Sequence, residues 1–178
     1  MIKIKMIFPI LIVTILGSSA SAQTFKYIGA GKCKLCHNRV ESGEQYNKWL
    51  IDPHSQAIKT LGNQASLDYA KKNNIADPAK EPKCLKCHST YDRIDANLRG
   101  GILATEGVSC EGCHGPGSSY KAIPIMRNHA QSLTMGLIVP DKQLCLECNN
   151  KENPFFKEFN YETSLAKIAH PNLTKGKH

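Results

Sequence analysis

Residues 33–37 read Cys33-Lys34-Leu35-Cys36-His37, and the same Cys-x-x-Cys-His pattern returns at residues 84–88 and 110–114. A fourth Cys-x-x-Cys pair, at residues 145–148, is followed by Asn149 instead of histidine. All 8 cysteines of the 178-residue chain belong to these pairs. Two thiols at this spacing share one face of a helical turn, where they add to the two vinyl groups of one haem, and the adjacent histidine ligates its iron. The pattern therefore predicts haem c.

Two other uses of paired cysteines fit this sequence less well. Four disulfides within the pairs would each close a very short loop and hardly constrain the unfolded chain. Four pairs also suit two zinc ribbons, but the histidine directly after three of the pairs favours haem. The predicted covalent attachment residues are Cys33, Cys36, Cys84, Cys87, Cys110, Cys113, Cys145 and Cys148.

The fourth pair leaves two interpretations open. Asparagine is a poor iron ligand compared with imidazole. Either a fourth haem is attached with its proximal position empty, filled by water or taken by a group such as Lys151, or the haem is absent and Cys145 and Cys148 form a vestigial, disulfide-bonded pair. The sequence thus predicts three haems and leaves the fourth open.

Histidines supply the predicted axial ligands. His178 is set aside because it ends the chain, where order is poor. The two methionines beyond the leader, Met126 and Met135, lie near one histidine, which excludes widespread His/Met ligation. The six predicted iron ligands are the three motif histidines and three distal candidates: His37, His88, His114, His54, His129 and His170. If four haems are attached, two axial positions stay vacant.

Each distal candidate falls in a predicted helix. Pro53 heads a stripe formed by His54, Ala57, Ile58 and Leu61. The i+4 repeat of Ile125, His129 and Leu133 predicts a second helix after Pro124, and the segment 165–169 predicts a third that leads to His170 and stops at Pro171.

The expected fold class is mainly α, with short helices and loops wrapped around a multihaem core. The 12 aromatic residues, with Trp49 the only tryptophan, are few for a conventional core. A short strand is expected at most at Ile102-Leu103 or Val108. Because haem would form the interior, removing haem is expected to remove the fold.

The first 22 residues have the layout of a secretory signal. Lys3 and Lys5 precede an apolar stretch at 7–16, and Ala20-Ser21-Ala22 forms a small-x-small cleavage site before Gln23. An uncleaved membrane anchor is the alternative. No later apolar run approaches the ~20 residues of a spanning helix. We therefore expect a signal peptide over 1–22, cleavage near Ala22-Gln23, and one exported, periplasmic domain over 23–178 that is not an integral membrane protein.

The formal charge of +8 does not indicate nucleic-acid binding. Each haem brings two propionates, and three or four haems add about −6 to −8, which brings the holoprotein near neutral. No basic motif interleaved with aromatic residues appears. Four lysines surround the first two motifs: Lys32, Lys34, Lys83 and Lys86. They fit either the docking of an acidic redox partner or an ordinary solvated surface.

The chain resembles the multihaem cytochrome c-554 family, tetrahaem electron carriers paired with hydroxylamine oxidation. The resemblance is carried by Tyr27-Ile28-Gly29-Ala30-Gly31-Lys32-Cys33-Lys34-Leu35-Cys36-His37, Trp49, Pro53-His54, Gly107-Val108-Ser109-Cys110-Glu111-Gly112-Cys113-His114-Gly115-Pro116-Gly117, Asn153-Pro154-Phe155 and Ala166-Lys167-Ile168-Ala169-His170-Pro171. Asn149 departs from the family pattern, which has histidine there.

The resemblance implies haems in closely packed pairs within a mostly helical fold. By position it implies His37 with His129 on the first haem, His114 with His54 on the third, and His170 on the distal side of the fourth. The second haem, on His88, would be five-coordinate and covered by the segment around Asn153-Pro154-Phe155.

These features predict an electron-transfer relay between redox proteins with no catalytic residue. An alternative is a small haem enzyme that binds nitric oxide, nitrite, hydroxylamine or peroxide at an open iron, on His88 or opposite Asn149. A third class is a subunit of an extracellular haem filament. The sequence identifies neither the redox partners nor the oligomeric state.

Overall fold

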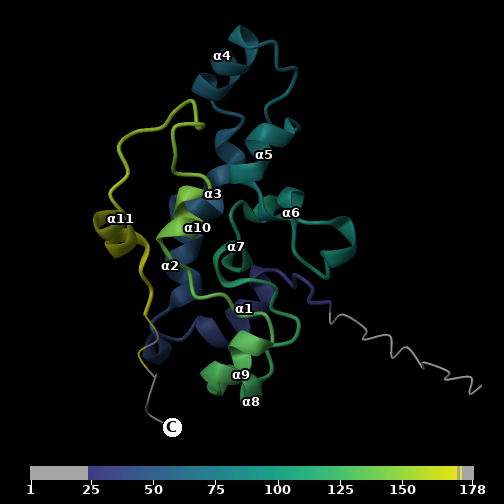
Figure 1. The fold of residues 1–178 in the computed structure, drawn as a ribbon, viewed down its shortest axis with the longest axis vertical. Coiled ribbons are helices and arrows are strands. Elements are labelled where there is room, and N and C mark those ends of the chain that lie inside the picture. The colour runs from purple at the N-terminus through teal and green to yellow at the C-terminus, as the bar shows by residue number, and fades with distance from the viewer. Residues whose placement is uncertain (1–23, 172, 174–178) are drawn as a thin grey trace, which may run out of the picture.

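The computed structural model describes residues 24–171 and residue 173, and in this part of the chain regular structure is almost entirely helical (Figure 1). An isolated parallel bridge joins Tyr27 to Arg99, and its backbone bonds are Tyr27 N to Leu98 O and Gly100 N to Tyr27 O, both at 2.8 Å. The predicted signal peptide, its cleavage site and His178 lie outside the described residues. No helix among the described residues is long and apolar enough to cross a membrane.

The α-helices and 3₁₀ turns (η) are joined by connections that range from single residues to the segment 147–160. In chain order they are α1 (Ala30–His37), η1 (Val40–Ser42), α2 (Gln45–Ile51), α3 (Pro53–Thr60), α4 (Gln64–Lys72), α5 (Pro82–His88), α6 (Thr90–Arg93), η2 (Ala96–Leu98), η3 (Ala104–Glu106), α7 (Cys110–His114), α8 (Ile123–Arg127), α9 (His129–Thr134), α10 (Lys142–Leu146) and α11 (Tyr161–Ile168). The longest, α4, has nine residues. Helices this short are marginal alone, so tertiary contacts must hold them.

Two of the predicted ligand helices are confirmed. Asp52 caps α3 by accepting a hydrogen bond from His54 N at 2.9 Å, and Pro53 occupies the first turn, where its missing N–H costs nothing. Helix α11 ends at Ile168, after which Ala169 is extended and Pro171 follows His170. His54 therefore lies in the first turn of α3, and His170 lies two residues beyond the end of α11.

Two other expectations were wrong. The predicted helix through Ile125 and His129 is two helices, α8 and α9, because the backbone of Asn128 is extended and its side chain accepts a hydrogen bond from Gln131 N at 3.1 Å. The strand expected at Ile102-Leu103 or Val108 does not form. Instead Val108 N donates to the carbonyl of His54, which fixes this loop against α3.

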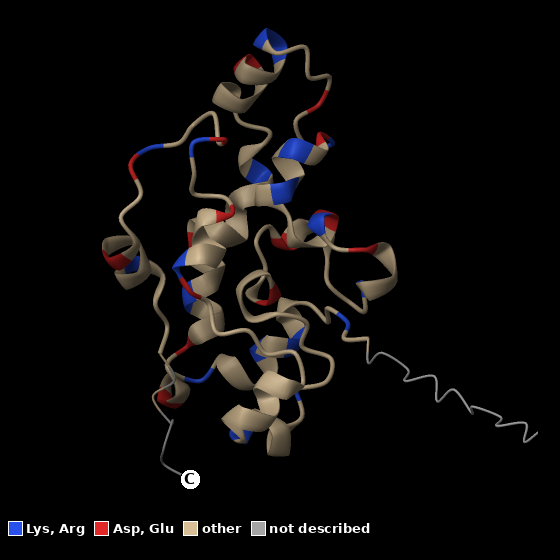
Figure 2. Cartoon of the chain, in the orientation of Figure 1, with Lys and Arg blue, Asp and Glu red and all other residues tan. Residues whose placement is uncertain are grey.

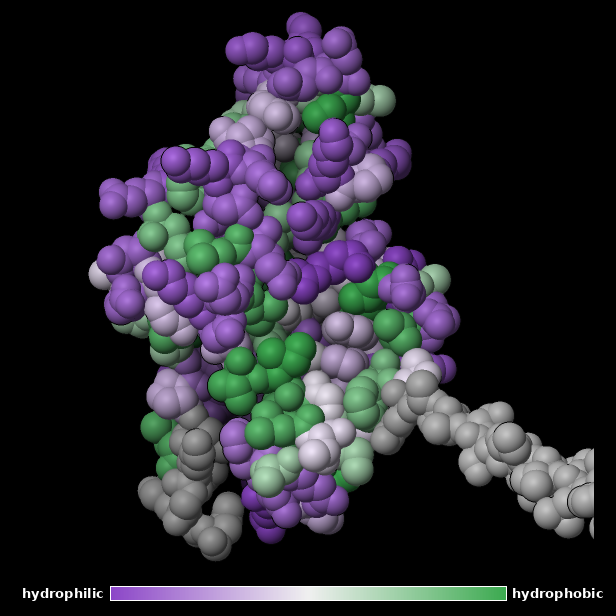
Figure 3. Space-filling model, viewed as in Figure 1, coloured by the Kyte–Doolittle hydropathy of each residue, from purple (hydrophilic) through white to green (hydrophobic). Residues whose placement is uncertain are grey.

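The apolar core of the described residues is small. Five apolar side chains are buried, and large apolar side chains remain exposed, as Figure 3 shows for one face. The buried set is Ala30, Leu61, Ala70, Ile102 and Tyr120. The exposed set is Leu35, Val40, Leu50, Ile51, Leu67, Leu103, Ile123, Leu133, Ile138, Val139, Phe155, Leu165 and Leu173. This balance is unusual for a domain of this length, since such side chains normally form its interior.

The elements are arranged along one long axis, with α4 at one end and α8 and α9 at the other (Figure 1). The C-terminal segment returns to the start of α2. Gln45 Nε2 donates to the carbonyl of Pro171 at 3.2 Å, and Leu173 N donates to the carbonyl of Ser42 at 3.0 Å. These bonds hold His170 against the first part of the chain.

Candidate haem-binding site

Each Cys-x-x-Cys pair lies on or directly after a short helix. Helices α1, α5 and α7 carry the first three pairs, and α10 carries Cys145, with Cys148 in the turn that follows. All eight cysteines are free thiols. Thiols three residues apart on a helix project from the same face, as addition to the two vinyl groups of one porphyrin requires.

The fold brings the four pairs together two by two. The side chains of Cys33 and Cys110 interact, which lowers the pKa of Cys33 and, with burial, raises the pKa of Cys110. Burial and an interaction with Cys87 raise the pKa of Cys148 to about 12. The first motif therefore contacts the third, and the second contacts the fourth.

A buried carboxylate fixes the first pairing. Glu111, inside the third motif and 2% exposed, accepts backbone hydrogen bonds from Ile28 (2.9 and 3.0 Å), Gly29 (2.7 Å) and Gly117 (2.6 Å). Burial raises the pKa of Glu111, and these three backbone donors oppose the shift. Glu106 adds a hydrogen bond from Ala30 N at 3.0 Å, at the start of α1. The two carboxylates tie the first motif's helix to the third motif.

Three of the predicted iron ligands have one ring nitrogen held by the protein. His54 Nδ1 lies 2.7 Å from Asp52 Oδ1, His88 Nδ1 lies 2.7 Å from the carbonyl of Ala57, and His170 Nδ1 lies 2.8 Å from the carbonyl of Ile168. Iron-ligating histidines normally use one nitrogen for such a contact and the other for the metal. In each of these histidines Nε2 is the nitrogen left for iron.

Three histidines gather where the first and third motifs meet the C-terminal segment. The rings of His114 and His170 have centroids 6.0 Å apart and planes at 75°. Burial lowers the pKa of His114, and His170 lowers it further. Burial also lowers the pKa of His37, against an opposing hydrogen bond to Gln45. Both imidazoles are therefore neutral near pH 7, which is the form that binds metal.

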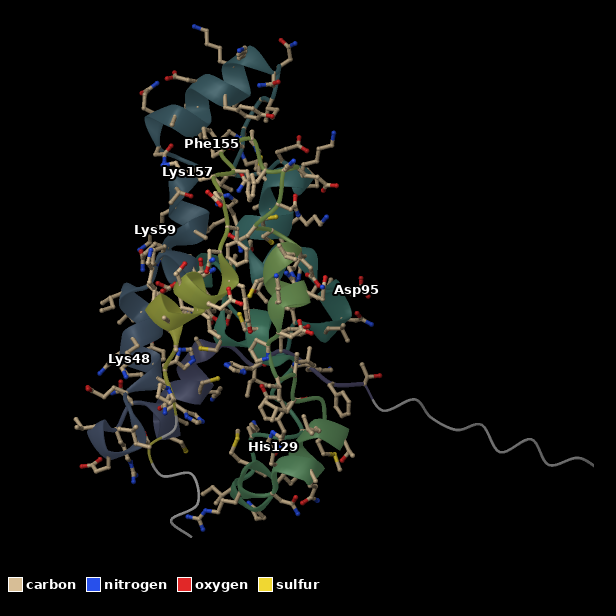
Figure 4. The ribbon with its side chains drawn as sticks, turned by 60° about the vertical axis from the view of Figure 1, so that its left-hand side comes forward. Lys48, Lys59, Asp95, His129, Phe155 and Lys157 are labelled. Atoms are coloured by element: carbon tan, nitrogen blue, oxygen red, sulfur yellow. The ribbon has the colours of Figure 1, made fainter. Side chains whose placement is uncertain are left out.

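Two predicted site features lie toward opposite ends of the molecule. Figure 4 shows Phe155 near α4 and His129 at the end formed by α8 and α9. His129 is exposed at the start of α9. The ring of Phe155 packs against Tyr69 of α4, with centroids 5.6 Å apart. Asp52 and Glu111 were not predicted as site residues, although an aspartate directly before Pro-His is itself the signal of a helix cap beside a ligand.

These residues fit haem c. A covalently held porphyrin needs thiol pairs with helical spacing and imidazoles with one free nitrogen. It also needs apolar side chains that are not already buried in a core. Among the described residues, no group of three or more His, Cys, Asp or Glu side chains is arranged to hold a metal ion, which differs from the four-ligand geometry of zinc ribbons. The helical fold and these residues together are those that covalently attached haem requires.

Comparison with known proteins gives the more specific class. The family model described as "Cytochrome c554 and c-prime" matches residues 32–115. Cytochrome c-554 of Nitrosomonas europaea is 28% identical over 119 residues, which cover 61% of this chain and 46% of the relative, so the chain spans about half of that relative's length. The solved reduced state of cytochrome c554 from Nitrosomonas europaea has a TM-score of 0.53 at 20% identity, covering 83% of this chain and 79% of that one, and it confirms the fold. Together the matches show that the chain is similar to c-554-type cytochromes.

Proposed function

We propose that this protein is an exported electron-transfer relay, a single domain over residues 23–178 that carries three haems on the Cys-x-x-Cys-His motifs and a fourth on Cys145 and Cys148. The carrying observation is the contact of Cys33 with Cys110 and of Cys87 with Cys148. Because each thiol would hold the edge of its own porphyrin, contacts between thiols of different motifs support haems packed in pairs.

The chain's own residues have defined tasks in this relay. The cysteines hold the porphyrins, and the six histidines named above act as axial ligands. Asp52 and the carbonyls of Ala57 and Ile168 orient three of those imidazoles. When bound, haem supplies an iron that changes oxidation state, at a potential set by ligands and burial.

Lysines beside the second motif fit the docking of an acidic partner. Lys83 and Lys86 are exposed on α5, and Figure 2 shows basic residues on this helix, just below α4. Charges of this kind steer diffusional encounter more than they add affinity. We propose that redox partners approach here with an acidic surface.

Intact mass together with a pyridine haemochrome assay tests the proposal. The purified, exported protein is expected to lack the leader, to carry four haems, and to show Soret and α bands that shift reversibly on reduction and reoxidation. A folded, colourless protein would contradict the relay altogether.

A further inference from the structure

In the fourth motif, the residue directly after the second cysteine is asparagine, and its side chain is bound to the backbone. We call the face of the haem on which this residue lies the motif side. Asn149 Nδ2 donates to the carbonyl of Cys145 at 2.9 Å, and Asn149 N donates to the same carbonyl at 3.1 Å. Asn150 repeats the pattern on the carbonyl of Leu146 at 2.8 Å. Both amides therefore close the end of α10. At the other motifs, the equivalent residue is an imidazole.

The amide of Asn149 is thus committed to the backbone and is chemically a weak ligand for iron. Its oxygen is neutral, and its nitrogen has no free lone pair comparable to that of imidazole. Lys151, the other nearby candidate, is exposed. An iron held by Cys145 and Cys148 would therefore have no protein ligand on the motif side.

A hollow opens beside Cys148. It is lined by Lys86, Arg93, Glu147 and Cys148. Arg93 Nη2 lies 3.5 Å from Glu147 Oε2, with the two side chains 30% and 51% exposed. The adjoining hollow adds Asp92, whose Oδ2 accepts a hydrogen bond from Ser89 Oγ at 2.6 Å. The hollow next to Cys148 itself therefore holds two cations and one carboxylate.

Lys86 and Arg93 line the hollow beside Cys148, so they would lie at the thioether edge of a haem held there. Thioether bonds form at the vinyl groups, and the propionates lie on the opposite edge of the porphyrin. A positive side chain at the thioether edge favours a small anion that approaches the iron from that region.

We propose that the fourth motif holds a haem whose motif-side position is open and binds a small anion, with Lys86 and Arg93 favouring the negative charge. The inference rests on the proposed attachment of a fourth haem. It concerns the motif side of the iron and takes His170, whose Nε2 is free, as the ligand on the opposite side.

The first test replaces Asn149 in the full-length holoprotein. Asn149→His restores the Cys-x-x-Cys-His pattern and should convert one haem equivalent from high spin to low spin in electron paramagnetic resonance, with loss of one azide-binding equivalent in a Soret titration. Asn150→His is the matched control, because it places an imidazole one residue out of register, and it should leave both signals unchanged. An unchanged spin state and azide stoichiometry in Asn149→His, with four haems present, would overturn the proposal.

The second test does not depend on that variant folding. Arg93→Gln should weaken azide binding to the wild-type haem set about three- to tenfold, the range expected when one partly solvated charge several ångströms away is removed. Lys142→Gln, an exposed charge change on the same helix as Cys145, is the control and should have no effect. Equal azide affinity in Arg93→Gln and wild type would remove the role given to the cations.

Haem counting separates the two proposals. Four haems are expected by mass. Three haems with reversible redox spectra would overturn the open fourth site and leave the relay standing, whereas a chain without haem would overturn both.

Discussion

At the scale of single residues, the Asp52 side chain makes two contacts with His54, one with its backbone N–H and one with its ring. The carboxylate caps α3 through His54 N at 2.9 Å and lies 2.7 Å from His54 Nδ1. The cap fixes where the helix starts, and the second contact fixes the orientation of the ring. A carboxylate partner also makes an imidazole a stronger donor to iron.

We expect Asp52→Asn to raise the midpoint potential of one haem. The neutral amide still caps the helix but withdraws negative charge from the imidazole, so the ferric state loses relative stability. A tenfold loss in the relative stability of the ferric state raises the midpoint potential by about 60 mV for one electron. Spectroelectrochemical titration measures the shift. Asp141→Asn, which changes another capping aspartate that accepts from Leu144 N, should leave all potentials in place, and an equal shift in both variants would contradict this role.

At the scale of elements, two close contacts join the third motif and the loop before it to other segments of the chain. Gly107 has φ +65°, and a Cβ there would lie 2.7 Å from the carbonyl oxygens of both His54 and Ser55. The loop can therefore pass α3 only with glycine at this position. Glu111 makes the second approach through its backbone donors in residues 28–29 and Gly117.

Gly107→Ala should destabilise the holoprotein by about 2 kcal/mol or more, since both backbone strain and the contact with α3 oppose it. In a domain of this size that lowers Tm by about 4–8 °C. We expect the absorption spectrum to change as well, because His54 must shift. Gly31→Ala in α1, where nothing lies within 4 Å, is the control and should be neutral or slightly stabilising. Equal Tm values for the two variants would show that the approach to α3 is unimportant.

Glu111→Gln should cost about 3 kcal/mol, because a single amide oxygen replaces two carboxylate oxygens and leaves buried N–H groups without acceptors. Thermal melting and faster hydrogen exchange at the amides of Ile28, Gly29 and Gly117 measure the loss. Glu158→Gln, at an exposed glutamate, is the control. Unchanged exchange at the three amides would mean that Glu111 does not join the two motifs.

At the scale of the whole molecule, the chain has too few buried apolar side chains to hold its short helices by itself. Five apolar residues are buried in the described part, while side chains such as Ile51 and Leu35 are 85% and 72% exposed. The largest fully buried side chain is Glu111. Porphyrins covering the exposed apolar groups would supply the missing interior.

The protein produced without haem attachment is therefore expected to be mostly unfolded. Far-UV circular dichroism at 222 nm should show less than half of the helical signal of the holoprotein, and no cooperative thermal transition should remain. A colourless chain with full helicity and a sharp melting transition would show that the polypeptide alone makes the core.

Local chemistry in the sequence determined the motif residues, the helical class and the starts and ends of the helices at His54 and His170. A thiol pair at i and i+3, a proline in the first turn and a proline after a helix act within a few residues. The periodic pattern of Ile125, His129 and Leu133 did not predict the break at Asn128, because the side chain of Asn128 caps a new helix there.

Only the tertiary structure decided which motifs meet. The contacts of Cys33 with Cys110, of Cys87 with Cys148 and of His114 with His170 join segments far apart in the chain. They depend on Glu111, Gly107 and the return of residues 170–173 to the start of α2, and no local pattern encodes such pairings because they arise from the packing of the whole chain.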